Sequence, residues 1–246
     1  MPMVTGIIAN EKFIQESSRC VYENDYVLVQ HLWIDEQVKE QVMLTLWYSR
    51  KSCAYAPHIL LYETGVEFKV RHVDFAENEQ TSPDFLSINP KGRVPALITP
   101  DGVLTENPAI LFYIAQIFPE KAFAPSKPFD LAKAQAFNMF LASTVHVAHA
   151  HKHRGYRWAD DASAQAAMTA KVPVNMADCA SMIQDHYFKG PFVLGESFSM
   201  CDPYLALLTR WLGPDGVSLD DFPKLKAHDE MMKQRPSVKQ VATLYD

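Results

Sequence analysis

Residues 89–97, NPKGRVPAL, are followed a short way downstream by Thr105-Glu106-Asn107 at the start of an apolar segment. The apolar run 94–98 predicts a strand, and Pro100-Asp101-Gly102 is typical of a tight turn that leads into a second, short strand. The helical spacing of apolar residues over 106–118, ended by Pro119, predicts an amphipathic helix. This stretch therefore predicts a strand, a turn, a strand and a helix in succession.

The residues before this stretch supply two more strands and two helical segments. Met43 to Ser49 predicts a strand, 56–64 predicts a short helix closed by Gly65, and 66–75 alternates like a second strand. Residues 84–88 predict a helical turn. The resulting order, β-α-β-α-β-β-α, predicts a small mixed sheet with helices packed on it.

The residues after it are predicted to be entirely helical. Residues 129–153 and 162–188 predict two long helices, and a last helical stretch begins at Asp221 and is broken at Pro236. Between them, Ser199-Met200-Cys201-Asp202 fits a capping box. Its Ser199 hydroxyl would accept from the Asp202 amide while the Asp202 carboxylate reaches back, so we expect a helix from there to about Leu212.

These patterns divide the chain into an extension (1–42), an α/β domain (43–120), a linker with two prolines (121–128) and an all-helical domain (129–246). The extension holds much of the chain's excess acidic charge and is too short to bury a core of its own, so we expect it to pack on the main body.

Composition narrows the classes of function. The chain has 246 residues and a net charge of −6, which argues against nucleic acid and anionic membranes as partners. No apolar run approaches the ~20 residues of a membrane span, and the N-terminus has no pattern of a secretory signal. The four cysteines, Cys20, Cys53, Cys179 and Cys201, form no Cys-x-x-Cys pair. We therefore expect free thiols and a cytoplasmic location.

The NPKGRVPAL segment, the Thr-Glu-Asn helix start and the Ser-x-x-Asp box together resemble the glutathione transferase family. The loop around Cys53 is most similar to the bacterial beta class of that family, and the resemblance covers about residues 43–246. It implies an N-terminal thioredoxin-like domain with a mixed four-stranded sheet, followed by an all-α domain. It also implies a homodimer, with glutathione as co-substrate.

The resemblance assigns the glutathione-binding role to Arg93, Val94, Pro95, Glu106 and Asn107. A cis proline at position 95 would expose the Val94 backbone, which could pair in strand fashion with the cysteinyl unit of glutathione. Glu106 could bind the γ-glutamyl ammonium. Asn107, at a helix N-terminus that favours anions, could donate to the γ-glutamyl carboxylate.

Cys53 is the predicted reactive thiol. It follows the first strand near a helix N-terminus, and the neighbouring Arg50 and Lys51 are expected to favour its thiolate. In the beta class the matching cysteine lies beside the glutathione sulfur. Ser52 and Tyr48 are further catalytic candidates, as hydrogen-bond donors to a thiol.

The second substrate is predicted to be a small hydrophobic electrophile that meets Tyr55, His146, Arg154 and Trp158. The histidine cluster 146–153 could suggest a metal site. No carboxylate or cysteine completes that set locally, however, and Lys152 and Arg154 would repel a cation, so no metal is expected.

One departure from the beta class leaves two functions open. The loop 76–80, AENEQ, is acidic where the beta class often has lysines that hold the glycine carboxylate of glutathione. That carboxylate would need Lys91, Arg93 or the segment near Arg154 instead. The sequence therefore predicts a detoxifying transferase, which could also carry out thiol–disulfide exchange through Cys53, with a non-catalytic binding or regulatory protein of the same fold as the alternative.

Overall fold

The structure is a computed structural model, and it describes residues 43–245. The predicted extension 1–42 lies outside the described residues, and so does Cys20.

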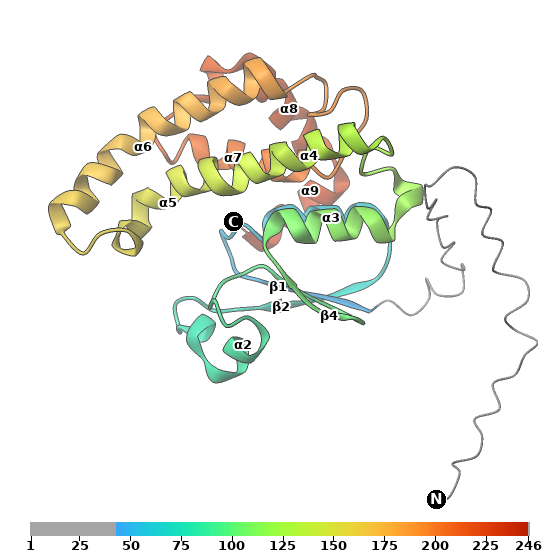
Figure 1. Ribbon diagram of the computed structural model, residues 1–246, viewed down its shortest axis with the longest axis horizontal. Helices are drawn as coiled ribbons and strands as arrows, with labels where there is room; N and C mark the ends of the chain where they lie inside the picture. The colour runs from blue at the N-terminus through green and yellow to red at the C-terminus, as the bar shows by residue number, and fades with distance from the viewer. Residues whose placement is uncertain (1–42, 246) are drawn as a thin grey trace, which may run out of the picture. The chain divides into compact units, whose positions relative to one another are not determined.

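A four-stranded sheet forms the first part of the described chain (Figure 1). The strands β1 (Leu44–Tyr48), β2 (Phe68–His72), β3 (Ala96–Thr99) and β4 (Gly102–Thr105) lie in the order β2-β1-β3-β4. β2 is parallel to β1, because a helix connects the two strands, whereas β3 pairs antiparallel with both β1 and β4. This is the mixed sheet that the sequence predicts.

Alternating side chains of β1 give the sheet two covered faces. Leu44 and Leu46 are fully buried in the main core, which also contains residues of α1 (Tyr55–Thr64) and α3 (Asn107–Ile117). Trp47 belongs to a separate small cluster, where it packs near Phe85 of α2 (Pro83–Ile88). β3 runs antiparallel to β1 and β4. One end of the sheet therefore carries the residues between β1 and α1, those before β3 and those before α3.

Helices form the rest of the described chain, in the order α4 (Pro128–Phe140), α5 (His146–Arg154), α6 (Ala162–Met182), α7 (Asp202–Leu212), α8 (Pro223–Gln234) and α9 (Pro236–Tyr245). The predicted long helix over 129–153 contains a π-helical turn at Leu141–Val145, and a second such turn, Ile183–Tyr187, extends α6. α7 is almost entirely buried, and α1 packs against both α7 and α9. No helix in the described range 43–245 is long and apolar enough to cross a membrane.

Candidate functional site

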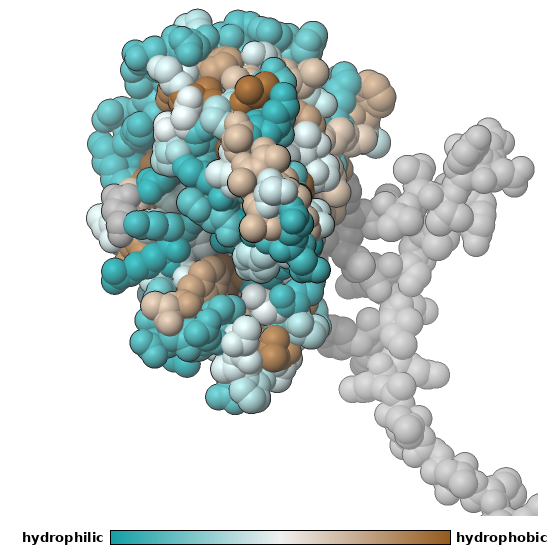
Figure 2. Space-filling model, turned by 90° about the vertical axis from the view of Figure 1, so that its left-hand side faces the viewer, coloured by the Kyte–Doolittle hydropathy of each residue, from teal (hydrophilic) through white to brown (hydrophobic). Residues whose placement is uncertain are grey.

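A pocket of about 550 Å³ is lined by both the α/β part and the helical part. The α/β part contributes the β1–α1 loop, the segment before β3 and the start of α3. The helical part contributes α5, the turn Gly155–Arg157 and α7. Figure 2 shows the side of the molecule where the ends of α5 and α2 lie, and hydrophilic side chains predominate there.

The segment before β3 brings its backbone to the pocket. The Val94–Pro95 peptide bond is cis, and Gly92 has φ +60°. A Cβ at Gly92 would lie 3.0 Å from the Gln80 carbonyl oxygen, so only glycine fits there without a shift. The Asn89 side chain donates to the Arg93 carbonyl at 2.5 Å and fixes the turn. Arg93, Val94 and Pro95 all line the pocket.

The N-terminus of α3 forms the adjoining wall. Glu106 precedes the helix with φ +73°, and its carboxylate pairs with the Lys91 ammonium at 2.5 Å. The Asn107 amide donates to the Cys53 carbonyl at 2.9 Å, while its own Oδ1 is buried with no hydrogen-bond partner in the described chain. Within residues 43–245, no side chain caps this helix end. The unpaired amide oxygen and the free end of the helix leave polar capacity for a ligand.

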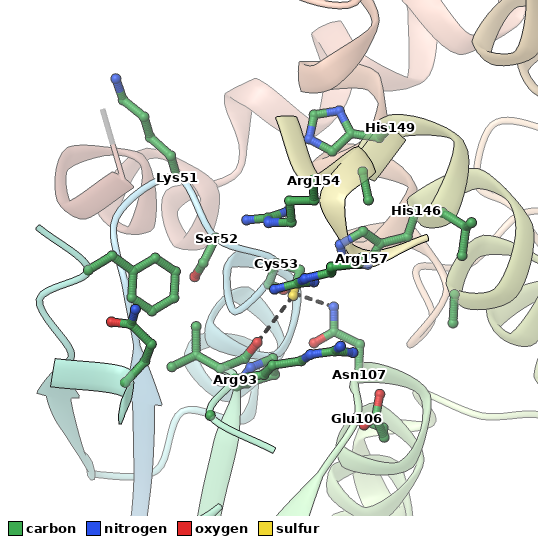
Figure 3. A pocket seen from close by; sticks show the side chains of 18 of the residues that line it. Lys51, Ser52, Cys53, Arg93, Glu106, Asn107, His146, His149, Arg154 and Arg157 are labelled. Carbon is green, nitrogen blue, oxygen red and sulfur yellow. Dashed lines mark hydrogen bonds between the residues drawn. The ribbon is translucent and has the colours of Figure 1, made fainter. Parts of the chain in front are cut away.

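Cys53 lies between these two walls, and its Sγ donates to the Val94 carbonyl at 3.4 Å (Figure 3). Burial raises the pKa of the thiol to about 12, and the charge of Glu106 also raises it. The charges of Arg154 and Arg93 and the cysteine's own N–H lower the pKa, but by less. The expectation of a thiolate favoured by Arg50 and Lys51 is therefore wrong. Desolvation outweighs the local cations, and the arginines that act on the sulfur come from elsewhere in the fold.

The other described cysteines give no contrast in acidity. Burial, followed by the charge of Asp178, raises the pKa of Cys179. Burial, followed by the charge of Asp202, raises the pKa of Cys201. Cys53 differs from them because it lines the pocket and is only partly buried. Access to the pocket, rather than thiol acidity, distinguishes it.

Of the other predicted residues, Ser52 lines the pocket, but its hydroxyl is engaged within the turn after β1. The Ser52 hydroxyl donates to the Ser49 carbonyl at 2.6 Å and accepts from the N–H groups of Ser49 and Ala54, so it stabilises the turn after β1. Tyr48 and Tyr55 do not line the pocket. Each ring centroid lies 5.3 Å from that of Tyr245, within the core. Their assignment to the site is wrong, because Tyr48 faces the same side as Leu44 and Leu46 and Tyr55 lies on the buried face of α1.

His146, Arg154 and Trp158 line the pocket from the helical side. Burial lowers the pKa of His146 to about 4, helped by the charges of His149, Arg154, Arg157 and Arg93, so this imidazole is neutral at pH 7. Its ring centroid lies 4.9 Å from that of Trp211 on α7.

Sequence reasoning missed Tyr204 and Trp211 among the lining residues, whereas His149 belongs to the histidine cluster that the sequence shows. His149 stacks on Trp211 with centroids 4.0 Å apart, and its Nδ1 lies 2.6 Å from the buried Asp215 carboxylate. Burial, and then the charge of Cys53, raises the pKa of Tyr204, which also lines the pocket. The one-turn spacing of His146 and His149 indicates a shared helix face, and both residues line the pocket. Nothing local in the sequence indicates Tyr204 or Trp211.

The described residues contain no group of three histidine, cysteine or acidic side chains that could hold a metal ion. His149, at the centre of the histidine cluster, has Asp215 as its partner.

Comparisons with known proteins agree with this architecture. The glutathione S-transferase N-terminal domain family matches residues 42–116. A glutathione transferase homologue from Sulfitobacter, crystallised with bound glutathione, is 45% identical with a TM-score of 0.80, over 82% of this chain and 98% of that one. The beta-class glutathione S-transferase of Sphingomonas chungbukensis is 33% identical with a TM-score of 0.67, over 81% and 97% of the two chains. The glutathione S-transferase GstA of Escherichia coli O157:H7 is 26% identical over 79% of this chain and 95% of its own.

Proposed function

The chain belongs to the glutathione transferase family, and we propose that it binds glutathione in this pocket and promotes attack of its thiolate on a small electrophile. The observation that carries the proposal is the convergence of Cys53, the Val94 backbone and the uncapped start of α3 on one pocket. The Sulfitobacter homologue, which holds glutathione, supports the choice of ligand.

The γ-glutamyl and cysteinyl parts of glutathione have matching groups in this pocket. The remaining first-turn N–H groups of α3 would hold the γ-glutamyl carboxylate, because a helix N-terminus favours an anion; Pro108 has no N–H, and the Ile110 N–H bonds to the Glu106 carbonyl. The Asn107 amide would contribute the hydrogen that it does not donate to the Cys53 carbonyl. Glu106 would exchange its present partner Lys91 for the γ-glutamyl ammonium. The Val94 carbonyl, which now accepts from Cys53, would accept from the cysteinyl N–H instead.

The reaction needs a glutathione thiolate in a buried place. The charges of Arg154 and Arg93 act on the sulfur of Cys53, so they would also stabilise a thiolate that binds beside it. The bound thiol loses its proton to solvent, its sulfur forms a bond to the electrophilic carbon, and the leaving group departs with its electron pair. Binding contributes mainly orientation of the two reactants.

Glu106→Ala tests the assigned glutathione site. A charge-assisted hydrogen bond is worth about 1.5–3 kcal/mol, so we expect the Kd for glutathione to rise about 10- to 100-fold in titration calorimetry. Glu67→Ala is the matched control, since Glu67 is exposed and remote from the pocket lining. Equal affinity of the Glu106 variant and the parent would show that the site is misassigned.

A rate assay with glutathione and a chloronitroaromatic compound separates catalysis from the non-catalytic alternative. A binding or regulatory protein would retain glutathione but would not accelerate its reaction with a chloronitroaromatic compound. We expect acceleration, because the pocket has free volume beside the sulfur and cations that favour the thiolate.

A second activity, thiol–disulfide exchange through Cys53, is supported by the position of its sulfur. When the cysteinyl unit of glutathione takes the Val94 carbonyl, the Cys53 thiol loses its hydrogen-bond acceptor and faces the ligand sulfur. The Cys53 thiolate would then attack a glutathione disulfide. One S–S bond forms, one breaks, and the displaced thiolate takes up a proton.

The exchange activity predicts a steep pH dependence. With a Cys53 pKa of about 12, the thiolate fraction and the rate of adduct formation with oxidised glutathione should rise about tenfold per pH unit between pH 7 and 9. Mass spectrometry should find the adduct on Cys53 and lose it in Cys53→Ala. An adduct mainly on Cys20, Cys179 or Cys201 would contradict the assignment.

We also propose a two-fold homodimer in the cytoplasm. Large apolar side chains are exposed on α4, where Phe129 is 72% and Met139 is 53% accessible, and on β4 at Val103. Such residues would be covered by a second copy. Light scattering at micromolar concentration should give twice the chain mass. A monomeric mass, or a dimer that persists in a Phe129→Glu, Met139→Glu variant, would contradict this interface.

A further inference from the structure

The pocket is cationic in a chain that is acidic overall. The whole chain carries a net charge of −6, yet the pocket is lined by Lys51, Arg93, Arg154 and Arg157. The acidic side chain among its lining residues, Glu106, already pairs with Lys91. An excess of positive charge at one pocket indicates a ligand with more negative than positive groups.

The arginines have no carboxylate partner within the part of the chain that the structure describes. The ion pairs there involve other residues, and none includes Arg93, Arg154 or Arg157. Figure 3 shows the side chains of Arg93 and Arg157 extending toward the space around Cys53, Arg93 from the α/β side and Arg157 from the helical side. The charges of all three also act on His146, which places them around one space.

Glutathione does not use all of these cations. It carries two carboxylates and one ammonium, and the start of α3 and Glu106 account for the γ-glutamyl pair. Arg93 or Lys51 is available to the glycine carboxylate, and Arg154 acts most strongly on the sulfur position. Arg157 acts on His146, and its charge is not among the largest that act on Cys53. With both carboxylates of glutathione matched to other groups, Arg157 is left for the second substrate.

The surroundings of Arg157 suit a flat molecule. Tyr156 and Trp158 flank it in sequence and are 59% and 47% exposed, and Trp211 forms a further aromatic wall of the pocket. The Arg157 guanidinium lies 5.9 Å from the centroid of the Tyr156 ring. Aromatic surfaces can stack on a conjugated ring, while a guanidinium binds a carboxylate through two parallel hydrogen bonds.

We propose that the preferred second substrate is a planar electrophile that carries a carboxylate, and that Arg157 binds that carboxylate. The inference rests on the proposed function and replaces the expected small hydrophobic electrophile with an anionic one. With a chloronitrobenzoate as the electrophile, the glutathione thiolate forms a C–S bond to the aromatic carbon that bears chlorine. The C–Cl bond breaks, and chloride leaves with the bonding electrons.

The experiment compares two substrates that differ in charge but share the reacting carbon, 4-chloro-3-nitrobenzoate and 4-chloro-3-nitrobenzamide. Each kcat/KM is divided by the uncatalysed rate constant of the same compound with glutathione, which removes the difference in intrinsic reactivity. We expect the parent protein to favour the benzoate about tenfold, and Arg157→Gln to lower that preference about tenfold. Arg157→Lys should restore part of it, since the charge remains but the two-pronged geometry does not.

Arg71→Gln is the matched control, because Arg71 is an exposed arginine on β2 outside the pocket lining, and it should leave the preference unchanged. Turnover of the benzamide with no preference for the benzoate, or a preference that survives Arg157→Gln, would overturn this inference and leave the proposed function intact. Failure to accelerate either substrate would overturn the proposed function, and the inference with it.

Discussion

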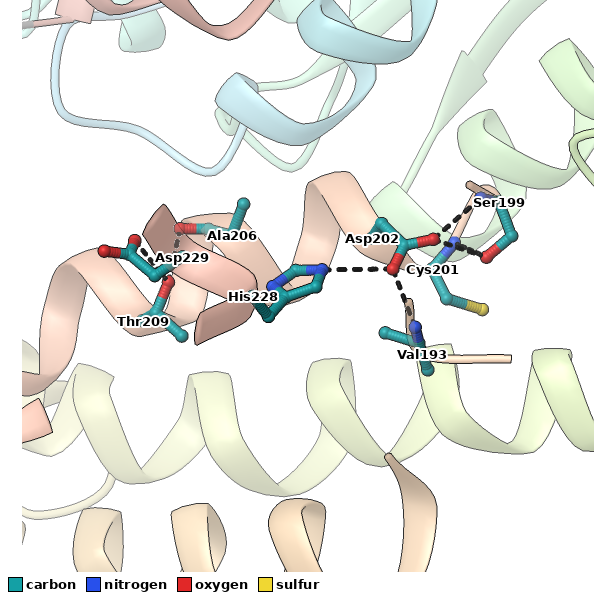
Figure 4. Close-up of polar contacts among 8 residues, drawn as sticks. All are labelled: Val193, Ser199, Cys201, Asp202, Ala206, Thr209, His228 and Asp229. Atoms are coloured by element: carbon teal, nitrogen blue, oxygen red, sulfur yellow. Dashed lines mark hydrogen bonds and ion pairs between the residues drawn. The ribbon is translucent and has the colours of Figure 1, made fainter. Parts of the chain in front are cut away.

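Two polar clusters of this protein differ in how completely their groups are paired: the Asp202 cluster of the helical part and the pocket beside Cys53. Both oxygens of the buried Asp202 carboxylate accept two hydrogen bonds each (Figure 4). Oδ1 accepts from the Val193 N–H at 2.8 Å and lies 3.0 Å from His228 Nε2, and Oδ2 accepts from the N–H and hydroxyl of Ser199 at 2.7 and 2.8 Å.

The pocket has the opposite character. The buried side-chain oxygens of Asn107 and Gln80 have no partner in the described chain, and no carboxylate pairs there with Arg93, Arg154 or Arg157. Unpaired buried groups cost stability, and those of the pocket lie where a ligand could complete them, unlike the unpaired Nδ1 of His228 beside Asp202. The Asp202 carboxylate, by contrast, has no capacity left for a ligand and serves the packing of the helices.

The largest expected effect follows from breaking the saturated cluster. Asp202→Ala removes four hydrogen bonds at once and leaves buried donors without an acceptor, so we expect a loss of about 3–5 kcal/mol in the free energy of unfolding. Urea denaturation measures it. Ser199→Ala removes the hydroxyl's hydrogen bond to Asp202 and the one it accepts from the Cys201 N–H, should cost about 1–2 kcal/mol, and remains measurable if Asp202→Ala does not fold.

The control is Asp220→Ala, which removes a carboxylate from an exposed pair with Lys226 and should leave the denaturation curve in place. If the Asp202 and Asp220 variants lose equal stability, the contrast between a buried cluster and a surface pair is wrong.

The fold was largely predictable because its signals are local. Gly65 closes α1 with φ +76°, the Pro100–Gly102 turn joins β3 to β4, and each strand lies within or next to its predicted range. The capping box was only half predictable. The Asp202 carboxylate reaches back to Ser199, but the Ser199 hydroxyl accepts from the Cys201 N–H rather than from that of Asp202.

The site was less predictable because its properties depend on what surrounds each residue. Sequence placed Cys53, Val94 and Asn107 near one another, and all three line the pocket. The cations that act on Cys53 belong to distant segments, and burial outweighs them. Which tyrosine faces the ligand also depends on tertiary packing, since Tyr48 and Tyr55 turn into the core while Tyr204, far away in sequence, reaches the pocket.

His58 lies in a third buried polar cluster, which differs from the other two because the only hydrogen-bond partner of its imidazole in the described chain is a neutral hydroxyl. His58 of α1 is fully buried among the rings of Tyr48, Tyr62 and Phe68. Its Nδ1 lies 3.2 Å from the Tyr245 hydroxyl, and its Nε2 has no partner in the described chain. Burial lowers the pKa of His58 to about 4. In the described chain His58 has no carboxylate partner, whereas Asp202 lies 3.0 Å from His228.

This difference predicts acid lability that comes from His58. The unfolded chain binds the proton below about pH 6.5, whereas the folded protein resists it until about pH 4, so stability is complete above pH 6.5 and falls as the pH is lowered toward 4. The loss from His58 alone should reach about 3 kcal/mol at pH 4. His146, whose pKa is also lowered to about 4, adds a loss of the same sign. Urea unfolding gives the free energy of unfolding at each pH between 7 and 4. The slope of that free energy against pH should be roughly halved in His58→Gln, while His153→Gln, at an exposed position, should keep the parent's slope. An undiminished slope in His58→Gln would mean that protons enter the folded core without cost and that a single neutral partner is enough for a buried imidazole.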